Sequence, residues 1–274
     1  MKKWHPYHIV EISPWPLIRS LNALILTSSV VVIIFYKNST PLLISITLLL
    51  ISATLWWRDI YRERTTQGLH VNYVITGLKV GIILFIISEI FFFISFFWAY
   101  FHSSLSSSLE IGLIWPPIII EPLSPILVPL VNTTVLLQSG VSITVAHHAI
   151  LTRKYKLSTS SLIITIILGI YFTILQLFEY FETTFSLNDS IYGSTFFIAT
   201  GFHGLHVIVG STFLIINLFK LTKKIHSPHH HLGFEIAAWY WHFVDIVWIF
   251  LYISIYWWGN NYFVSIILVH LTSN

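Results

Sequence analysis

The sequence predicts an all-α polytopic membrane bundle of seven transmembrane helices, and three observations support this. Of the 274 residues, 55% are hydrophobic and only 9% are charged, and the mean hydropathy is +0.80. This composition leaves too little polar surface to cover a soluble globule. Apolar stretches long enough to span a bilayer recur along the chain, and basic residues are concentrated in alternate connections between them.

Each helix is expected where an apolar stretch runs between polar, proline or tryptophan-marked breaks. The first should begin beside Trp15, and the apolar part of the second should run from Pro41 to Trp56 and Trp57, where an interfacial aromatic belt would place these tryptophans. The proline-rich stretch at 114–129 cannot be one regular helix, so it is expected as an ordered outer loop before the fourth helix. The expected helices cover about residues 15–36, 41–64, 73–105, 128–151, 156–183, 191–224 and 233–258.

The charges of the connections predict the orientation of the chain. Every lysine and arginine except Lys37 belongs to the N-terminal segment or to the second, fourth or sixth connection. Because basic loops stay on the side of synthesis, the N-terminus should lie inside and the C-terminus outside. No linker divides the chain, so residues 1–259 are expected to form a single domain, followed by a C-terminal extension at 260–274. The net charge of +3 needs no nucleic acid to explain it.

Glu89 stands within an apolar run at 78–102. Ten residues beyond Lys79, the helical rise carries it about 15 Å inward, close to the bilayer midplane. A charged acid at a helix centre costs roughly 2.5 to 3.5 kcal/mol, so Glu89 should be protonated, paired, or in contact with protein, water or lipid headgroups. It is therefore a candidate functional carboxylate, with a neutral side chain hydrogen-bonded to a neighbouring helix as the alternative.

Histidine is the residue on which a metal or haem site would depend, because the chain has no cysteine. One di-metal centre would need three clusters that are expected at different depths, so no metal site is predicted. A haem between His102 and His203 or His206 would give the alternative function, a self-sufficient histidine-ligated membrane redox protein. For His203 and His206, packing between helices is favoured over haem ligation, because glycines flank them. The three clusters are His147 with His148, His203 with His206, and His229 with His230 and His231.

Two further pairs of polar residues are expected to be structural. Glu179 and Glu182 share a face near the outer end of the fifth helix, where interfacial solvation is expected. His242 and Asp245 stand at i, i+3 spacing and are expected to form a hydrogen-bonded couple. Nothing in the sequence resembles a nucleophile with its base or a nucleotide fingerprint, so no catalytic residue is predicted.

A cluster of tryptophan, arginine and histidine residues lies at the inner interface between the second and third helices. It consists of Trp56, Trp57, Arg58 and Asp59, followed by Arg62, Glu63, Arg64 and His70. Guanidinium, indole and imidazole donors can hold a phosphate while tryptophan rings border the acyl chains. The cluster therefore predicts a binding site for a phospholipid headgroup.

Several strings of this sequence resemble subunit III of mitochondrial cytochrome c oxidase. The resemblance runs from about Trp4 to Gly259. It rests on strings that include Ser13-Pro-Trp-Pro, Trp56-Trp-Arg-Asp, Ile86-Ile-Ser-Glu, Trp115-Pro-Pro, Ala146-His-His, Gly201-Phe-His-Gly-Leu-His and Trp239-Tyr-Trp-His-Phe-Val-Asp.

The resemblance implies a non-redox core subunit of respiratory complex IV in the inner mitochondrial membrane. Helices one and two would be separated from helices three to seven by a V-shaped, lipid-filled cleft. Haem a and copper would belong to partner subunits, and this chain would support subunit I in oxygen reduction coupled to proton pumping. Its implied partners are subunits I and II, small accessory subunits and membrane phospholipid; membership of a respiratory supercomplex stays open.

The resemblance also assigns site residues. Glu89 matches the family's buried carboxylate, Trp57, Glu63 and His70 match phospholipid contacts, and Lys220 and His230 fall where basic lipid contacts lie. The lipid would be phosphatidylglycerol, phosphatidylethanolamine or cardiolipin. The family usually ends just after Gly259, whereas this chain continues with an apolar patch at 263–271 that is too short to span and is expected outside the membrane or on its outer interface.

Overall fold

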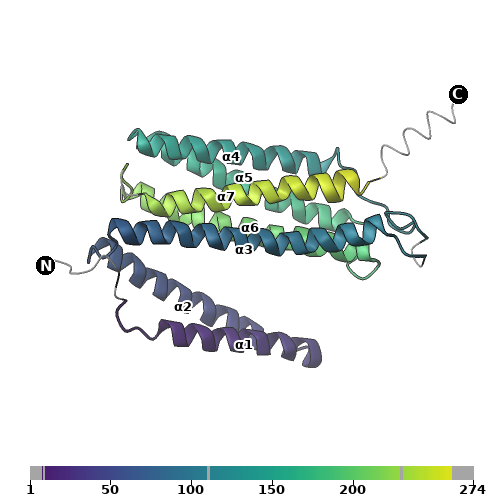
Figure 1. Cartoon of the computed structure of the whole chain (residues 1–274), viewed down its shortest axis with the longest axis horizontal. Helices are drawn as coiled ribbons and strands as arrows, with labels where there is room; N and C mark the ends of the chain where they lie inside the picture. The colour runs from purple at the N-terminus through teal and green to yellow at the C-terminus, as the bar shows by residue number, and fades with distance from the viewer. Residues whose placement is uncertain (1–7, 9, 110–111, 229–230, 261–274) are drawn as a thin grey trace. The chain divides into compact units, whose positions relative to one another are not determined.

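The structure, a computed structural model, describes residue 8 and residues 10–109, 112–228 and 231–260. Among these residues, seven helices are long and apolar enough to cross a membrane, which confirms the predicted fold class. The predicted extension at 260–274 lies outside the described residues except for Asn260. The elements are α1 (Trp15–Tyr36), α2 (Thr40–Thr65), α3 (Asn72–Leu105), α4 (Val128–Leu151), α5 (Tyr155–Glu182), α6 (Ile191–Thr222), α7 (Leu232–Leu251) and the π-helix η2 (Tyr252–Trp258) (Figure 1).

The chain divides into two compact units, residues 1–81 and 82–274, and each is described by itself. The first contains α1, α2 and the first turns of α3. The second contains the rest of α3 with α4, α5, α6, α7 and η2. The expectation of a single domain over 1–259 stays a prediction.

In the first unit, α1 and α2 form an antiparallel hairpin that is held by small and polar side chains. The Asn22 amide donates to Ser52 Oγ at 3.1 Å, and the Arg19 guanidinium donates to the Leu49 carbonyl at 2.8 Å. The residues buried in these helices are Asn22, Ser29, Ser45, Ser52 and Ala53. Small side chains let two membrane helices approach closely, and their polar groups then bond across the contact.

In the second unit, the core is centred on Trp241 of α7, which is fully buried. Its indole occupies space left by two glycines, because a Cβ added to Gly169 or Gly210 would come within 2.6 or 2.9 Å of the ring. The indole nitrogen donates to Ser139 Oγ of α4 at 2.8 Å. Trp241 therefore ties α4, α5, α6 and α7 together at one point.

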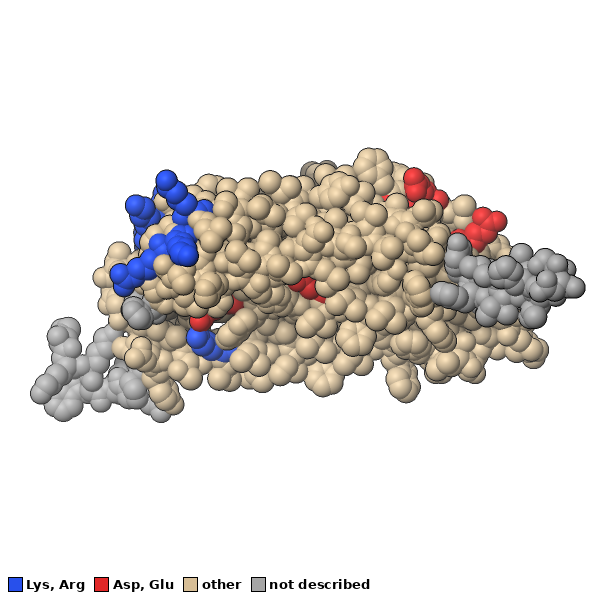
Figure 2. Space-filling model, turned by 90° about the horizontal axis from the view of Figure 1, so that it is seen from above, with Lys and Arg blue, Asp and Glu red and all other residues tan. Residues whose placement is uncertain are grey.

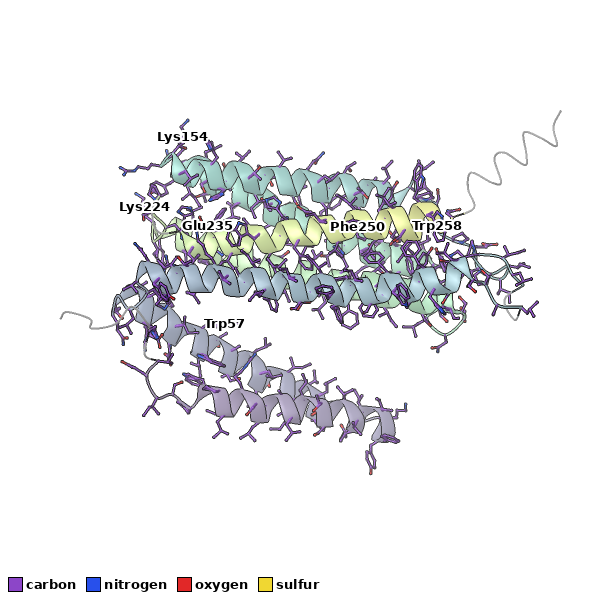
Figure 3. All side chains as sticks on the ribbon, in the orientation of Figure 1. Trp57, Lys154, Lys224, Glu235, Phe250 and Trp258 are labelled. Carbon is purple, nitrogen blue, oxygen red and sulfur yellow. The ribbon has the colours of Figure 1, made fainter. Side chains whose placement is uncertain are left out.

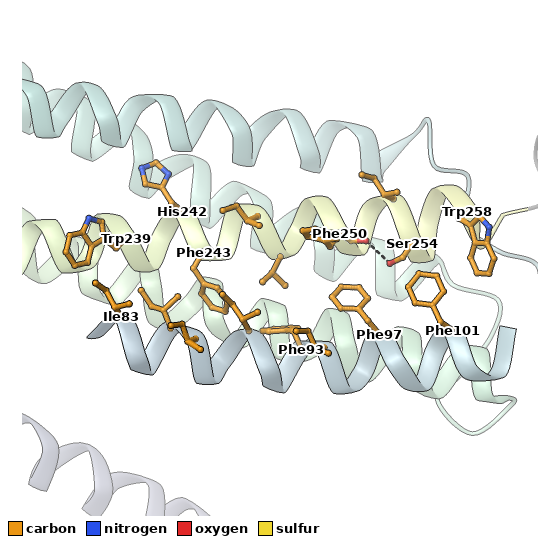
Figure 4. A pocket seen from close by; sticks show the side chains of 17 residues that line it. Ile83, Phe93, Phe97, Phe101, Trp239, His242, Phe243, Phe250, Ser254 and Trp258 are labelled. Carbon is orange, nitrogen blue, oxygen red and sulfur yellow. Dashed lines mark hydrogen bonds between the residues drawn. The ribbon is translucent and has the colours of Figure 1, made fainter. Parts of the chain in front are cut away.

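Within the second unit, the part of α3 beyond residue 81 packs on α6 and α7 through aromatic rings. The ring of Phe96 stacks on Phe202 of α6 with centroids 5.5 Å apart, and Phe93 lies 6.1 Å from Phe243 of α7. An apolar pocket of about 1070 Å³ remains between α3 and α7 (Figure 4). No charged side chain is among the described residues that line it, so it offers a purely hydrophobic surface apart from His242 and Ser254.

In the second unit, lysines lie near one end of the helices. On the face drawn in Figure 2, the visible lysines and arginines lie toward one end, whereas acidic side chains are visible both at the opposite end and between the two. Figure 3 places Lys154, Lys224 and Glu235 at one end of the second unit and Trp258 at the opposite end. This separation agrees with the alternating charges of the sequence.

Candidate functional site

Glu89 is paired with a histidine. Its position is midway along α3, and its carboxylate Oε2 lies 2.9 Å from Nε2 of His206 on α6. The His206 side chain is 8% exposed and that of Glu89 is 22% exposed. A paired Glu89 was one of the expected outcomes, and the structure supplies His206 as the partner.

The hydrogen bonds of His206 determine the charge of this pair. Nδ1 of His206 lies 2.7 Å from the carbonyl oxygen of Phe202, which can only accept, so Nδ1 carries a proton. Nε2 then either accepts from a protonated Glu89 or, in an imidazolium, donates to a carboxylate. One proton is shared between Glu89 and His206 in both cases, and the net charge of the pair is zero. A neutral pair avoids most of the cost of an isolated charge near the midplane.

Aromatic rings surround the imidazole of His206. Phe93 of α3 lies 5.1 Å from it, and Phe243 of α7 lies 5.9 Å from it, both edge-on. Tyr240 stacks on it with centroids 6.2 Å apart. Such a shell has a low effective dielectric constant, which strengthens the Glu89–His206 bond and makes the loss of either partner costly.

His203, one turn away on α6, bonds in another direction. Its Nε2 donates to the carbonyl of Val244 on α7 at 3.1 Å, and its ring packs on Trp248 with centroids 5.1 Å apart. The two histidines therefore do not share one site: His206 reaches α3, and His203 reaches α7. His102 is exposed near the end of α3.

In the first unit, a second polar cluster forms where α2 ends. His8 Nε2 lies 3.3 Å from Glu63 Oε2, and its ring meets His70 edge-on with centroids 5.7 Å apart. One turn away, the indole of Trp15 donates to Asp59 at 2.7 Å. Burial lowers the pKa of His70, with further lowering from the charges of His8 and Arg64, so this ring favours its neutral form.

Comparison with known proteins identifies the family. The family model of cytochrome c oxidase subunit III matches residues 5–260. Over 256 residues, 93% of this chain and 98% of each relative, the chain is 57% identical to cytochrome c oxidase subunit 3 of Mus musculus, 56% to that of Pelomedusa subrufa and 54% to that of Aedes aegypti. The chain belongs to the cytochrome c oxidase subunit III family.

The expected lipid-binding residues of this family member fall in both units. Trp57 and Arg62 are exposed on α2, and Glu63 and His70 meet through His8. Lys220 lies in the last turn of α6 in the second unit. His230 lies outside the described residues. Asp59 was predicted as a member of the cluster, whereas His8 and Trp15 were not. Trp15 carried a signal, since it marks the start of the first apolar stretch, but His8 carried none.

The expectation for Glu179 was wrong. Glu182 is exposed, but the Glu179 side chain is buried, and its Oε1 accepts from the Tyr256 hydroxyl at 2.5 Å and from the Gln176 amide at 3.4 Å. Gln176 also accepts from Asn132 of α4 at 3.4 Å. The network therefore joins α4, α5 and η2, because η2 extends α7 far enough to cover Glu179.

His242 and Asp245 lie close together, with Nδ1 of His242 3.7 Å from Oδ2 of Asp245. Asp245 is buried against α4. A Cβ added to Gly140 would come within 2.6 Å of that same carboxylate oxygen. Gly140 thus leaves room for a buried carboxylate between α4 and α7.

Proposed function

We propose that this chain is a non-redox core subunit of cytochrome c oxidase that supports the catalytic subunit I in oxygen reduction coupled to proton pumping. Its family membership supports assembly into that complex. The observation that carries the non-redox part is the use of the intramembrane histidine nitrogens. His203 Nε2 and both nitrogens of His206 are engaged by Val244, Phe202 and Glu89.

A haem ligand needs a ring nitrogen with a free lone pair directed at the iron. His206 could supply one only if it gave up the bond to Glu89, which would leave a partly buried carboxyl without its partner. His203 donates its Nε2 proton to a backbone carbonyl. Its Nδ1 has no hydrogen-bond partner among the described residues, but the ring is fully buried between Phe172 and Trp248, so this nitrogen faces packed side chains. These contacts support packing over haem ligation, and haem a and copper would then reside in partner subunits.

The second part of the proposal is phospholipid binding at the inner interface. Trp57 and Arg62 are exposed on α2 next to the His8–Glu63–His70 contacts. An exposed guanidinium can hold a phosphate, and an exposed indole borders acyl chains. The headgroup would be that of phosphatidylglycerol, phosphatidylethanolamine or cardiolipin, with Lys220 and His230 as further basic contacts and the lipid-filled cleft as the place of its tails.

The proposal includes location and partners. The chain would span the inner mitochondrial membrane with its N-terminus in the matrix and its C-terminus in the intermembrane space, in contact with subunits I and II and accessory subunits. The alternating basic connections support this orientation. A glycosylation or protease-accessibility map of the intact membrane tests it, because the opposite orientation would expose the loop around Lys154 on the outer side.

Quantifying the phospholipid retained by the intact oxidase tests the lipid site. After detergent washing, Arg62→Gln and Trp57→Leu should each lower the retained phospholipid by about one equivalent. Lys154→Gln is the matched control, since it removes an exposed basic charge from an inner connection of the other unit. The lipid proposal fails if both variants keep the full complement, or if the control loses as much.

A further inference from the structure

Two of the histidine clusters meet at one end of the second unit. His147 on α4 and His231, the residue that precedes α7, approach with their Nε2 atoms 3.3 Å apart. Glu235, one turn into α7, places Oε1 3.5 Å from the same nitrogen of His231. One ligand atom from each of the three residues lies within 4.8 Å of the other two.

These separations suit a metal ion. Zinc holds nitrogen and oxygen ligands at about 2.0 to 2.2 Å in a tetrahedron, so neighbouring ligand atoms stand roughly 3.3 Å apart. The His147–His231 and His231–Glu235 distances are already close to that value. The third distance, between the ligand atoms of His147 and Glu235, has to shorten only modestly. A rotation of the Glu235 side chain can bring this about.

The proton on His231 is in the position that a metal ligand requires. Nδ1 of His231 lies 3.1 Å from the carbonyl oxygen of Ser227, which can only accept, so Nδ1 carries the proton in the neutral ring. Nε2 then has its lone pair directed toward His147 and Glu235. A backbone carbonyl that holds the far nitrogen of a histidine in this way is the usual outer support of a metal ligand.

The surroundings also favour a cation. Glu235 brings a negative charge to two neutral donors, and the ring of Phe234 lies 5.7 Å from that of His147, which limits water on one side. The His147 and Glu235 side chains remain partly exposed. An ion can therefore enter, and a water can occupy the fourth position.

We propose that His147, His231 and Glu235 bind a single divalent cation of the zinc type, which joins the end of α4 to the start of α7. No metal site was predicted from the sequence, because one di-metal centre would have needed all three histidine clusters together. One histidine from each of two clusters is enough, and a glutamate supplies the third ligand. The site holds no redox-active centre, so it is independent of the proposed function of the chain.

Zinc binding by the intact oxidase tests the proposal. The complex is stripped with a chelator, titrated with Zn²⁺ alone, and its zinc content per complex is measured by mass spectrometry. His147→Gln should lose one equivalent, and Glu235→Gln should lose it or bind it at least tenfold more weakly. His148→Gln is the control, because this exposed neighbour does not belong to the group. Other zinc sites of the complex contribute equally to all samples.

The proposal is overturned if both variants bind as much zinc, as tightly, as the unsubstituted complex, or if the control loses the same equivalent. A second measurement needs no variant. Carbethoxylation of His147 in the unsubstituted complex should fall at least fivefold when Zn²⁺ is present, while that of His148 should not change. Equal labelling of His147 with and without Zn²⁺ would mean that the two histidines form only a hydrogen bond.

Discussion

Glu89 and His206 share one proton between α3 and α6, with 2.9 Å between Oε2 and Nε2. Because Nδ1 of His206 is committed to the Phe202 carbonyl, the shared proton is the one that keeps the pair neutral. The pair thus links two helices by a hydrogen bond. Because its net charge is zero, it does not oppose insertion into the bilayer.

Substitution of Glu89 tests this interhelical hydrogen bond. Glu89→Gln should be tolerated, since its amide can donate to Nε2 of His206. Glu89→Ala leaves that nitrogen without its partner and should cost about 1 to 3 kcal/mol of stability. Thermal unfolding of the assembled oxidase measures both. Turnover and proton pumping should be unchanged in Glu89→Gln, and a loss of pumping in this variant would show that Glu89 relays protons.

Glycine substitutions test the packing around Trp241. Gly169→Ala and Gly210→Ala should each destabilise the chain by about 1 to 3 kcal/mol, because the added methyl group collides with the indole. Gly204→Ala is the matched control on α6, where an added Cβ meets nothing within 4 Å. Assembly yield and thermal midpoint are the readouts. Equal effects at positions 204 and 210 would contradict this account of the core.

A double-mutant cycle tests the hydrogen-bond network around Glu179. Tyr256→Phe leaves one oxygen of buried Glu179 with a single weaker donor, the Gln176 amide, and should cost about 1 to 3 kcal/mol. Glu179→Leu removes the acceptor and leaves the Tyr256 hydroxyl without this partner, so it should also destabilise the chain. Since the two groups contact each other, the double variant should be less destabilised than the sum of the single ones. Strict additivity in thermal unfolding would indicate that the hydroxyl and the carboxyl do not interact.

The pKa of His70 makes stability depend on pH. A lowered pKa in the folded chain means that the unfolded chain takes up a proton first as the pH falls. The stability contributed by the neutral ring is therefore complete above the unfolded pKa of about 6.5 and is lost as the pH falls through the folded value. His70→Asn should reduce the drop in thermal midpoint between pH 7.5 and pH 5. An unchanged drop would exclude His70 as its source.

The seven helices could be predicted because each apolar stretch ends at a break that is visible locally, such as Pro14 before α1 or the charges after α4. The partner of Glu89 could not, because His206 is 117 residues away along the chain and no local pattern links them. Glu179 was misassigned for a related reason. A glutamate near a helix end is typical of an interface, and only the path of η2 shows that Tyr256 covers it.

The ligands of the proposed metal site could not be grouped from the sequence either. Adjacent histidines on a helix point about 100 degrees apart, which argues against a site within the pair formed by His147 and His148. The fold instead brings His147 to His231, across 84 residues. The number of residues between the clusters that contain His147 and His231 does not indicate this contact.

The most direct test of the central claim is the haem and copper content per assembled complex in His203→Gln and His206→Gln. If these histidines serve contacts between helices and leave electron transfer to neighbouring subunits, both variants should contain the same haem and copper per complex as the unsubstituted oxidase, even where assembly is reduced. The loss of one haem or one copper from either variant would contradict the claim.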